Sequence, residues 1–238
     1  QVLKTDGSGA LSWATSSSGA SNVTGLSDAL IEDNSMYVGQ DPISTTSTAE
    51  YNVSLGTTAL DAITTGDKNT AMGYDAMTNS TSAANNTAVG YESLKTNTSG
   101  ANNTANGFRA LSNNTTGGQN SALGYSALRA NSTASFNTAV GYLSLFDANR
   151  TADTDGYNVA LGSNAGYTGT NDVTTGNKNT LLGASTAASA AAGTNQTVIG
   201  YGASGKGDNT VTIGNGDITL WSAADDNEVD LGSNSVEF

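Results

Sequence analysis

The sequence predicts an all-β fold, a parallel β-solenoid with coils of about 14–21 residues. A ten-residue segment recurs almost unchanged, as NNTAVGYESL at residues 85–94 and as FNTAVGYLSL at residues 136–145. The recurrence has a fixed spacing, which is typical of a chain that winds into stacked coils. Because only 6% of the residues are aromatic and 12% are charged, composition alone would permit disorder, and the periodicity is what argues for an ordered fold.

Each coil is marked by a glycine that closes a short apolar segment, and we call these residues the marker glycines. Their successive spacings are 17 residues six times, then 21, 21, 17 and 14. The added residues fall in polar loops at residues 145–157 and 167–178, where a solenoid tolerates insertion. The marker glycines are Gly39, Gly56, Gly73, Gly90, Gly107, Gly124, Gly141, Gly162, Gly183, Gly200 and Gly214.

Within each coil we expect two short strands followed by a polar loop. The first strand is Asn-Thr-Ala-Val-Gly, as at residues 137–141, and the second is Tyr-x-Ala-Leu, as at residues 125–128. The loop is a segment such as KTNTSGA at residues 95–101. Strands this short form no free sheet, but coils stacked about 4.8 Å apart would pair them into parallel ladders.

Side-chain alternation predicts which residues of the first strand face the interior. We expect the large aliphatic residue before each marker glycine to face inward, with the Thr or Ser two positions earlier on the same face. The small residue between them would then let another backbone approach. Asn106 occupies an aliphatic position and is interpreted as a tolerated polar defect or as part of an ion site at a symmetry axis. The aliphatic residues are Val38, Leu55, Met72, Val89, Leu123, Val140, Leu161, Leu182, Ile199 and Ile213.

The repeat divides the chain into three parts. Residues 1–34 carry no repeat and are expected to form a β-hairpin around DGSG, a linker, and a short helical or neck segment that Ser27 would cap. Residues 35–214 form the solenoid, and residues 215–238 form a capping coil or lead into a following domain. Because the sequence begins with Gln1, we expect it to be a piece of a longer or processed chain.

Two columns of residues recur at one position per coil. The aromatic column could be a receptor platform for sugars or a stacked ladder between coils. The asparagine column, just before each strand, is interpreted as structural, because Asn accepts turn conformations and can hydrogen-bond along a stack. The aromatic column is Tyr74, Tyr91, Phe108, Tyr125 and Tyr142. The asparagine column is Asn52, Asn69, Asn86, Asn103, Asn120, Asn137, Asn158 and Asn179.

Composition argues against most chemistry. Cysteine and histidine are both absent from the sequence, which removes thiolate ligands and the commonest general base. The net charge of −13 disfavours nucleic acid and anionic membranes, and no apolar run is long enough for membrane insertion. Acidic segments at residues 152–156 and 224–230 could hold calcium, but their spacing favours solvated loops. We expect no catalytic residue, no cofactor and no metal site.

The repeat Asn-x-x-(Val/Ile/Leu)-Gly-x-x-(Ala/Ser) resembles the head domains of trimeric autotransporter adhesins, the YadA-like head. NTVTIGNGD at residues 209–217 is most similar to it. The resemblance implies a left-handed parallel β-roll assembled as an intertwined or side-by-side homotrimer. The longer coils, with QVLKTDGSGALSW at residues 1–13 and GLSDALIEDNSMYVG at residues 25–39, resemble tail-fibre and other virion proteins of marine bacteriophages.

These resemblances imply a trimeric structural and adhesive fibre, a phage tail fibre or virion surface appendage that attaches to a host. Its partners would be a host cell-surface glycan or protein receptor and other virion fibre or baseplate proteins. A bacterial surface adhesin head on the cell surface is the alternative. An acyltransferase of the hexapeptide type is disfavoured, because one hexapeptide unit occurs per coil and histidine is absent. An ice-binding solenoid is disfavoured, because alternation would point Thr70, Thr87, Thr104 and Thr138 inward.

Overall fold

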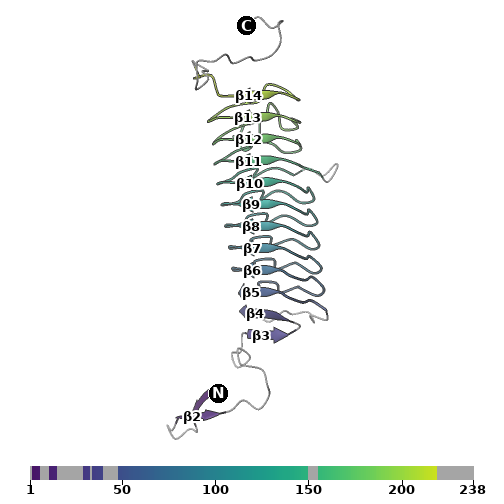
Figure 1. Ribbon diagram of the computed structural model, residues 1–238, viewed down its shortest axis with the longest axis vertical. Helices are drawn as coiled ribbons and strands as arrows, with labels where there is room; N and C mark the ends of the chain where they lie inside the picture. Colours follow the sequence, from purple (N-terminus) through teal and green to yellow (C-terminus); the bar gives the residue numbers. More distant parts are fainter. Residues whose placement is uncertain are drawn as a thin grey trace, which may run out of the picture.

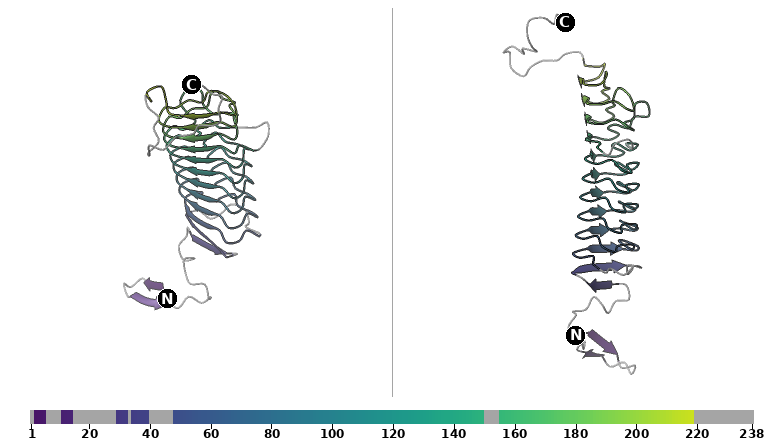
Figure 2. Two further views of the ribbon diagram at one scale, coloured as in Figure 1. Left: turned by 45° about the horizontal axis from the view of Figure 1, so that its top comes forward. Right: turned by 90° about the vertical axis from the view of Figure 1, so that its right-hand side faces the viewer.

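The computed structural model describes residues 2–5, 11–14, 29–32, 34–39, 48–149 and 155–218. All regular structure in these residues is β, and strands β3 to β14 belong to a long stack of coils (Figures 1 and 2). The strands of the stack are β4 (Ser35–Gly39), β5 (Val53–Gly56), β6 (Thr70–Met72), β7 (Thr87–Val89), β8 (Thr104–Asn106), β9 (Ser121–Leu123), β10 (Thr138–Val140), β11 (Val159–Leu161), β12 (Thr180–Leu182), β13 (Thr197–Ile199) and β14 (Val211–Ile213).

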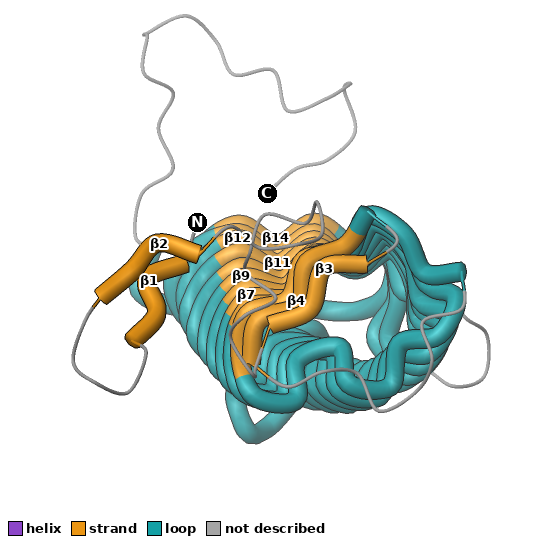
Figure 3. The backbone as a smooth tube through the Cα atoms, turned by 90° about the horizontal axis from the view of Figure 1, so that it is seen from below, coloured by secondary structure: helices purple, strands orange, loops and turns teal. Residues whose placement is uncertain are grey.

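Strands β4 to β14 pair in parallel, each with its neighbours in sequence. Equivalent repeat positions pair with each other, so that Thr70 is opposite Thr87 and Gly39 is opposite Gly56. Seen along the stack, the coils superimpose, with the strands on one wall and turns and loops forming the rest (Figure 3). The predicted parallel β-solenoid is therefore confirmed.

Two antiparallel pairs precede the parallel strands. Strand β1 (Val2–Thr5) pairs with β2 (Leu11–Ala14), on either side of the expected hairpin turn. Strand β3 (Ala29–Glu32) pairs with β4 across a turn in which Asn34 has a φ of 59°. The expectation of a helical segment here was wrong for residues 29–32. Their apolar residues form a strand, which covers the edge that β4 would otherwise leave unpaired.

The second predicted strand of each coil is a series of tight turns. In the coil of Tyr125, both Ser126 and Leu128 have a φ of 52°, in the left-handed region. The turns still pair with the next coil, since the Leu128 N–H donates to the Ser144 carbonyl at 3.0 Å. Alternating positive φ values bend the chain back within a few residues. This makes a coil narrower than two facing strands would allow.

The narrow coil reverses the predicted interior face of the strands. In strands β5 to β11 the small middle residue is buried, as Ala88 and Ala105 are, while the flanking Thr and aliphatic residues point outward. Leu123, predicted to face inward, is 49% exposed. Large side chains enter the interior from the turns instead, and they are Leu60, Met77, Leu94, Leu111, Leu128 and Leu145. The prediction failed because strand and turns lie so close that only one of the two walls can carry large residues.

At most of the marker glycines, a side chain would meet the backbone of the next coil. Gly107 has a φ of 140°, and a Cβ there would lie 2.4 Å from the carbonyl oxygen of Gly124 in the next coil. The same approach recurs at Gly124, whose Cβ would lie 2.4 Å from the oxygen of Gly141. Glycine at these positions therefore lets a coil pack this closely on the next one, since any other residue would place its Cβ against that backbone.

The asparagine column forms a buried hydrogen-bond ladder, as predicted. The Oδ1 of Asn86 accepts the backbone N–H of Asn103 at 2.8 Å, and the Oδ1 of Asn103 accepts that of Asn120 at 2.9 Å. The Nδ2 of Asn103 donates to the Gly117 carbonyl at 2.9 Å. Each side chain thus satisfies backbone groups that the narrow interior removes from water.

Candidate functional site

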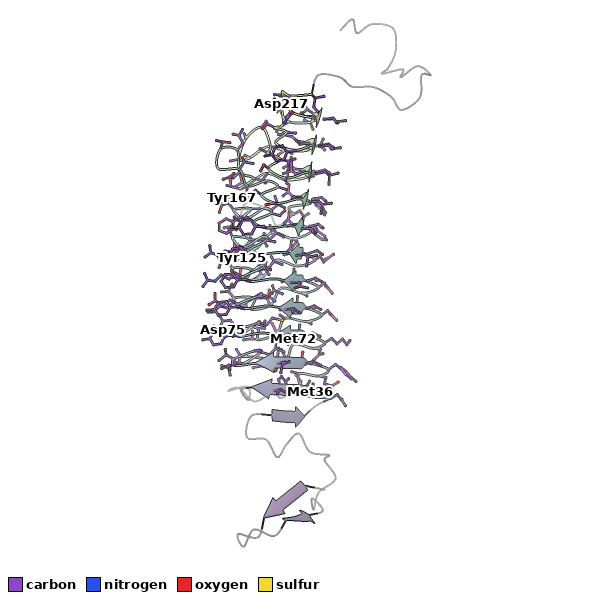
Figure 4. The ribbon with its side chains drawn as sticks, turned by 90° about the vertical axis from the view of Figure 1, so that its left-hand side faces the viewer. Met36, Met72, Asp75, Tyr125, Tyr167 and Asp217 are labelled. Atoms are coloured by element: carbon purple, nitrogen blue, oxygen red, sulfur yellow. The ribbon has the colours of Figure 1, made fainter. Side chains whose placement is uncertain are left out.

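The outward face of the parallel strands is an unusually apolar surface. One column is the predicted aliphatic one, in which Leu55, Met72, Leu161 and Ile213 are exposed. The second column lies two residues earlier on each strand and carries Thr or Val in most coils. Figure 4 labels Met36 and Met72 on the strands. Thr87 and Thr104 are exposed on this face, so the expectation that these threonines point inward was wrong. We call these two columns the outer sheet face.

The polar exception, Asn106, lies on the same face. Its side chain is exposed, so it is not an interior defect. Its neighbours in the column, Val89 and Leu123, are aliphatic. Asn106 therefore places one amide within an otherwise apolar column.

The aromatic column is a continuous stack of rings along another part of the surface. Tyr125 is labelled in Figure 4 on the margin away from the strands. Neighbouring rings are stacked with centroids 4.9–5.3 Å apart and planes inclined by 6–23°. Within the stack, each internal ring has both faces covered by other rings. Only the ring edges, and the end faces of Tyr74 and Tyr142, are left for a ligand.

A charged cluster lies beside the lower rings of the stack. The Nζ of Lys95 lies 2.8 Å from Asp75 and 2.9 Å from Glu92, and the Nε of Arg109 lies 2.6 Å from Glu92. The guanidinium of Arg109 also lies 5.2 Å from the centroid of the Phe108 ring. The cluster cross-links successive coils, because Asp75, Glu92 and Arg109 occupy successive repeats.

The ion pairs change the acid–base behaviour of the cluster. Burial alone would raise the pKa of Asp75, but hydrogen bonds from Lys95 and Thr58 outweigh it and lower that pKa. The pKa of Glu92 is lowered in the same way, against burial, by hydrogen bonds from Lys95 and Arg109. Hydrogen bonds to Asp75 and Glu92 raise the pKa of Lys95. All of these groups are therefore charged at neutral pH, which suits a structural clamp and not proton transfer.

A cavity that the sequence did not predict lies where the aromatic column ends. Its volume is about 460 Å³, and Tyr142 and the loop at residues 167–170 line it. Two signals in the sequence point to it. The aromatic column stops, with Ser163 and Ala184 in the following two coils, and the marker spacing grows to 21 residues at the same place.

The remaining candidate sites offer no chemistry in the residues that the structure describes. Most of the acidic segment at residues 152–156, and all of that at 224–230, lies outside those residues. Among the described residues, no group of three or more Asp or Glu side chains could hold a metal ion. No helix in that part of the chain is long and apolar enough to cross a membrane.

Comparison with known proteins adds no family to this picture. Searches against protein-family models, curated proteins and solved structures found no match to the chain.

Proposed function

We propose that the protein is a structural and adhesive fibre module that assembles as a homotrimer through its outer sheet face. The observation that carries this proposal is the column of aliphatic side chains on the outer face of the strands, which Asn106 interrupts and in which residues such as Leu123 and Leu161 are about half exposed. Monomeric proteins rarely leave such a surface in water. The fold offers a rigid rod, and the apolar column offers the surface by which several rods would pack together.

The outer sheet face is long and narrow, and its dimensions set the area that an assembly would bury on it. Strands β4 to β14, about 4.8 Å apart, give a stripe roughly 50 Å long and about 10 Å wide, or roughly 500 Å² per chain. Three chains meeting on this stripe would bury roughly 1,500 Å² in total, or roughly 500 Å² for each pair of chains. A standard two-protein interface buries roughly 1,200–2,000 Å², so the residues beside the stripe would have to take part in the trimer as well. The number three comes from the resemblance to the trimeric adhesin heads.

Attachment to a host follows from the same resemblance. In this proposal the module belongs to a phage tail fibre or another virion appendage, and many weak contacts on a trimer add through effective concentration. A bacterial surface adhesin head is the alternative location. Genes for portal, capsid and tail proteins beside its own would support the first, and a gene for an outer-membrane anchor would support the second.

Sedimentation velocity tests the assembly directly. The protein should sediment as a species of about three 23.8 kDa chains. Replacing Leu123 and Leu161 by Glu should yield folded monomers, because six carboxylates would meet across the interface. The matched control, Ser99→Glu with Thr116→Glu, adds the same charge to exposed loop positions and should remain trimeric. A wild-type monomer, or a trimer that survives Leu123→Glu with Leu161→Glu, would contradict the proposal.

A second candidate function, ice binding, is favoured by the outward threonines. Thr87 and Thr104 stand on adjacent strands of a regular face, as a lattice-matching surface requires. The two functions compete for one surface, because a face buried between chains cannot meet ice. Thermal hysteresis together with a monomeric state would favour ice binding, and a trimer without hysteresis would exclude it.

A further inference from the structure

The aromatic stack ends at a ring whose outer face is free. Tyr142 stacks on Tyr125 through one face, with centroids 5.2 Å apart. The ladder position of the next two coils holds Ser163 and Ala184, so no described ring covers the other face of Tyr142. Half of the Tyr142 surface is exposed, at 52%. The stack therefore presents one flat, unpaired aromatic face toward the following coils.

That ring borders the cavity of about 460 Å³. The volume lies within the range of small-ligand sites. The cavity extends over the next coils, where Asn164, Ser185 and Ser204 line it, and the loop at residues 167–170 closes one side. Figure 4 labels Tyr167 on the same margin as Tyr125, away from the strands, so the site stays accessible when the outer sheet face is covered.

The loop that forms the wall is held in place by its own hydrogen bonds. Asp172 accepts the backbone N–H of Thr168 at 2.5 Å and that of Gly169 at 2.7 Å. The N–H of Val173 donates to the Gly166 carbonyl at 2.9 Å and closes the base of the loop. The wall is thus formed before any ligand arrives, which lowers the entropic cost of binding.

The wall is also supported from below by aromatic packing. The ring of Tyr167 packs on that of Phe146 with centroids 4.8 Å apart, and the guanidinium of Arg129 lies 5.3 Å from the Phe146 centroid. These contacts fix the base of the loop against the preceding coils. Few side-chain rotations would have to be frozen on binding.

The lining groups are neutral hydrogen-bonding groups around an aromatic face. Hydroxyl groups come from Thr168, Thr170, Ser185 and Ser204, and the amide comes from Asn164. The Oδ1 of Asn164 is buried and has no hydrogen-bond partner among the described residues. No charged side chain of the described residues lines the cavity, and the chain carries a net charge of −13, so an anionic ligand has no counter-charge here.

We propose that this cavity binds a neutral glycan, with one pyranose ring on the free face of Tyr142 and its hydroxyl groups on the Thr, Ser and Asn side chains. A pyranose has an apolar C–H face and a rim of hydroxyl groups, which matches an aromatic face bordered by neutral donors and acceptors. This proposal rests on the attachment function proposed above, and it names the class of ligand that attachment would use. The internal rings of the stack support Tyr142 but do not contact the sugar.

Saturation-transfer-difference NMR on the full chain tests the proposal. The probes are maltotriose, cellotriose, laminaritriose, mannotriose and triacetylchitotriose, with sialyllactose as an anionic control. At least one neutral probe should receive saturation, strongest on the ring C–H protons of one sugar face, and sialyllactose should receive none. No transfer to any neutral trisaccharide would overturn the proposal.

A matched pair of variants locates the site. Tyr142→Ser introduces the residue that the next coil carries in the same column, and it should weaken binding of the responding sugar at least about tenfold. Tyr74→Ser makes the same change at the other end of the stack, at a residue that does not line this cavity, and should leave binding unchanged. Equal losses in both variants would contradict the assignment. Thr170→Val, on the exposed loop, should also weaken binding of the sugar. This variant tests the site if Tyr142→Ser does not fold.

The result can be separated from the fate of the fibre proposal. Sedimentation velocity reports assembly, and NMR reports sugar binding on the same sample. A trimer that binds no neutral sugar would overturn only the glycan site, and a monomer that binds one would overturn only the trimer.

Discussion

The first 17-residue coils and the coils that follow them fill their interiors from opposite walls. In the 17-residue coils, the strand contributes a small residue such as Ala105 and the turn contributes a large one such as Leu111. After Gly162 the roles reverse, because Gly166 and Ala187 occupy the turns while Leu181 and Val198 are buried in the strands β12 and β13. The wall that supplies the large interior side chains therefore changes.

The contact at Gly166 shows the exchange in detail. A Cβ there would lie 2.7 Å from the Cδ2 of Leu145 and 3.1 Å from the Cδ1 of Leu181. Leu145 is the last large residue of the turn column, and Leu181 is the first large buried residue in a strand after β4, so both reach toward the space that the glycine leaves. The cavity beside Tyr142 forms in these same coils, where the turn side chains become small. Where the repeat is uniform, equivalent side chains stack in continuous ladders. Where the turn residues change, the coils leave a cavity on the surface.

The largest expected effect comes from breaking the close stacking of the uniform coils. Gly107→Ala should destabilise the fold by about 4 kcal/mol, because φ is 140° and the new Cβ meets a backbone carbonyl that cannot move aside. Gly216→Ala, in the last described turn, meets nothing within 4 Å and should change stability little. Chemical denaturation of both variants checks the contrast, and equal losses would refute the role of close approach.

Removing one side chain from the asparagine ladder should destabilise the fold almost as much. Asn103→Ala leaves the buried Asn120 N–H without its partner and removes one of the two side-chain hydrogen bonds to the Gly117 carbonyl, which Asn114 still donates to at 2.9 Å. The loss should cost about 3 kcal/mol. Asn113→Ala is the control, since Asn113 belongs to the same coil but is exposed. Thermal unfolding should separate the two variants clearly. A loss in Asn113→Ala as large as that in Asn103→Ala would argue against the buried ladder.

The exchange of interior walls predicts a coupled pair of substitutions. Leu181→Ala should cost about 3 kcal/mol by opening a void, and Gly166→Leu should cost about 2 kcal/mol by overpacking. The double variant recreates the pattern of the uniform coils, so its loss should be smaller than the two single losses together. A double-mutant cycle in denaturant measures the coupling. Simple additivity would mean that the two positions do not share one space.

The smallest effect concerns the charged cluster of the uniform coils. Because the pKa values of Asp75 and Glu92 are lowered, their contribution is present above the unfolded pKa values near 4 and is lost as the pH falls through the folded values. Lys95→Met should therefore lower stability by up to about 1 kcal/mol at pH 7. Unfolding at about pH 2 should show little difference between the variant and the wild type, and a constant difference would contradict this account.

Much of the architecture could be predicted from local pattern. The spacing of the marker glycines predicted the coil boundaries, and the parallel pairing followed because identical repeats stack in register. The asparagine ladder was predicted as well, since a residue that recurs once per coil must meet its own copies. The hairpin at Asn34 shows the opposite case, in which a short apolar segment fitted both a helical turn and a strand.

The sequence by itself determined the period, the register and the columns, because these depend only on which residues recur at which spacing. The tertiary structure decided which columns of the strands face the interior and which face the solvent. Alternation along a strand distinguishes two faces but does not say which is buried, and the narrow coil placed Ala88 inside and Leu123 outside. It also decided where the cavity lies, since a hollow depends on how Tyr142 and the loop at residues 167–170 come together in space, and spacing along the chain carries no such distance.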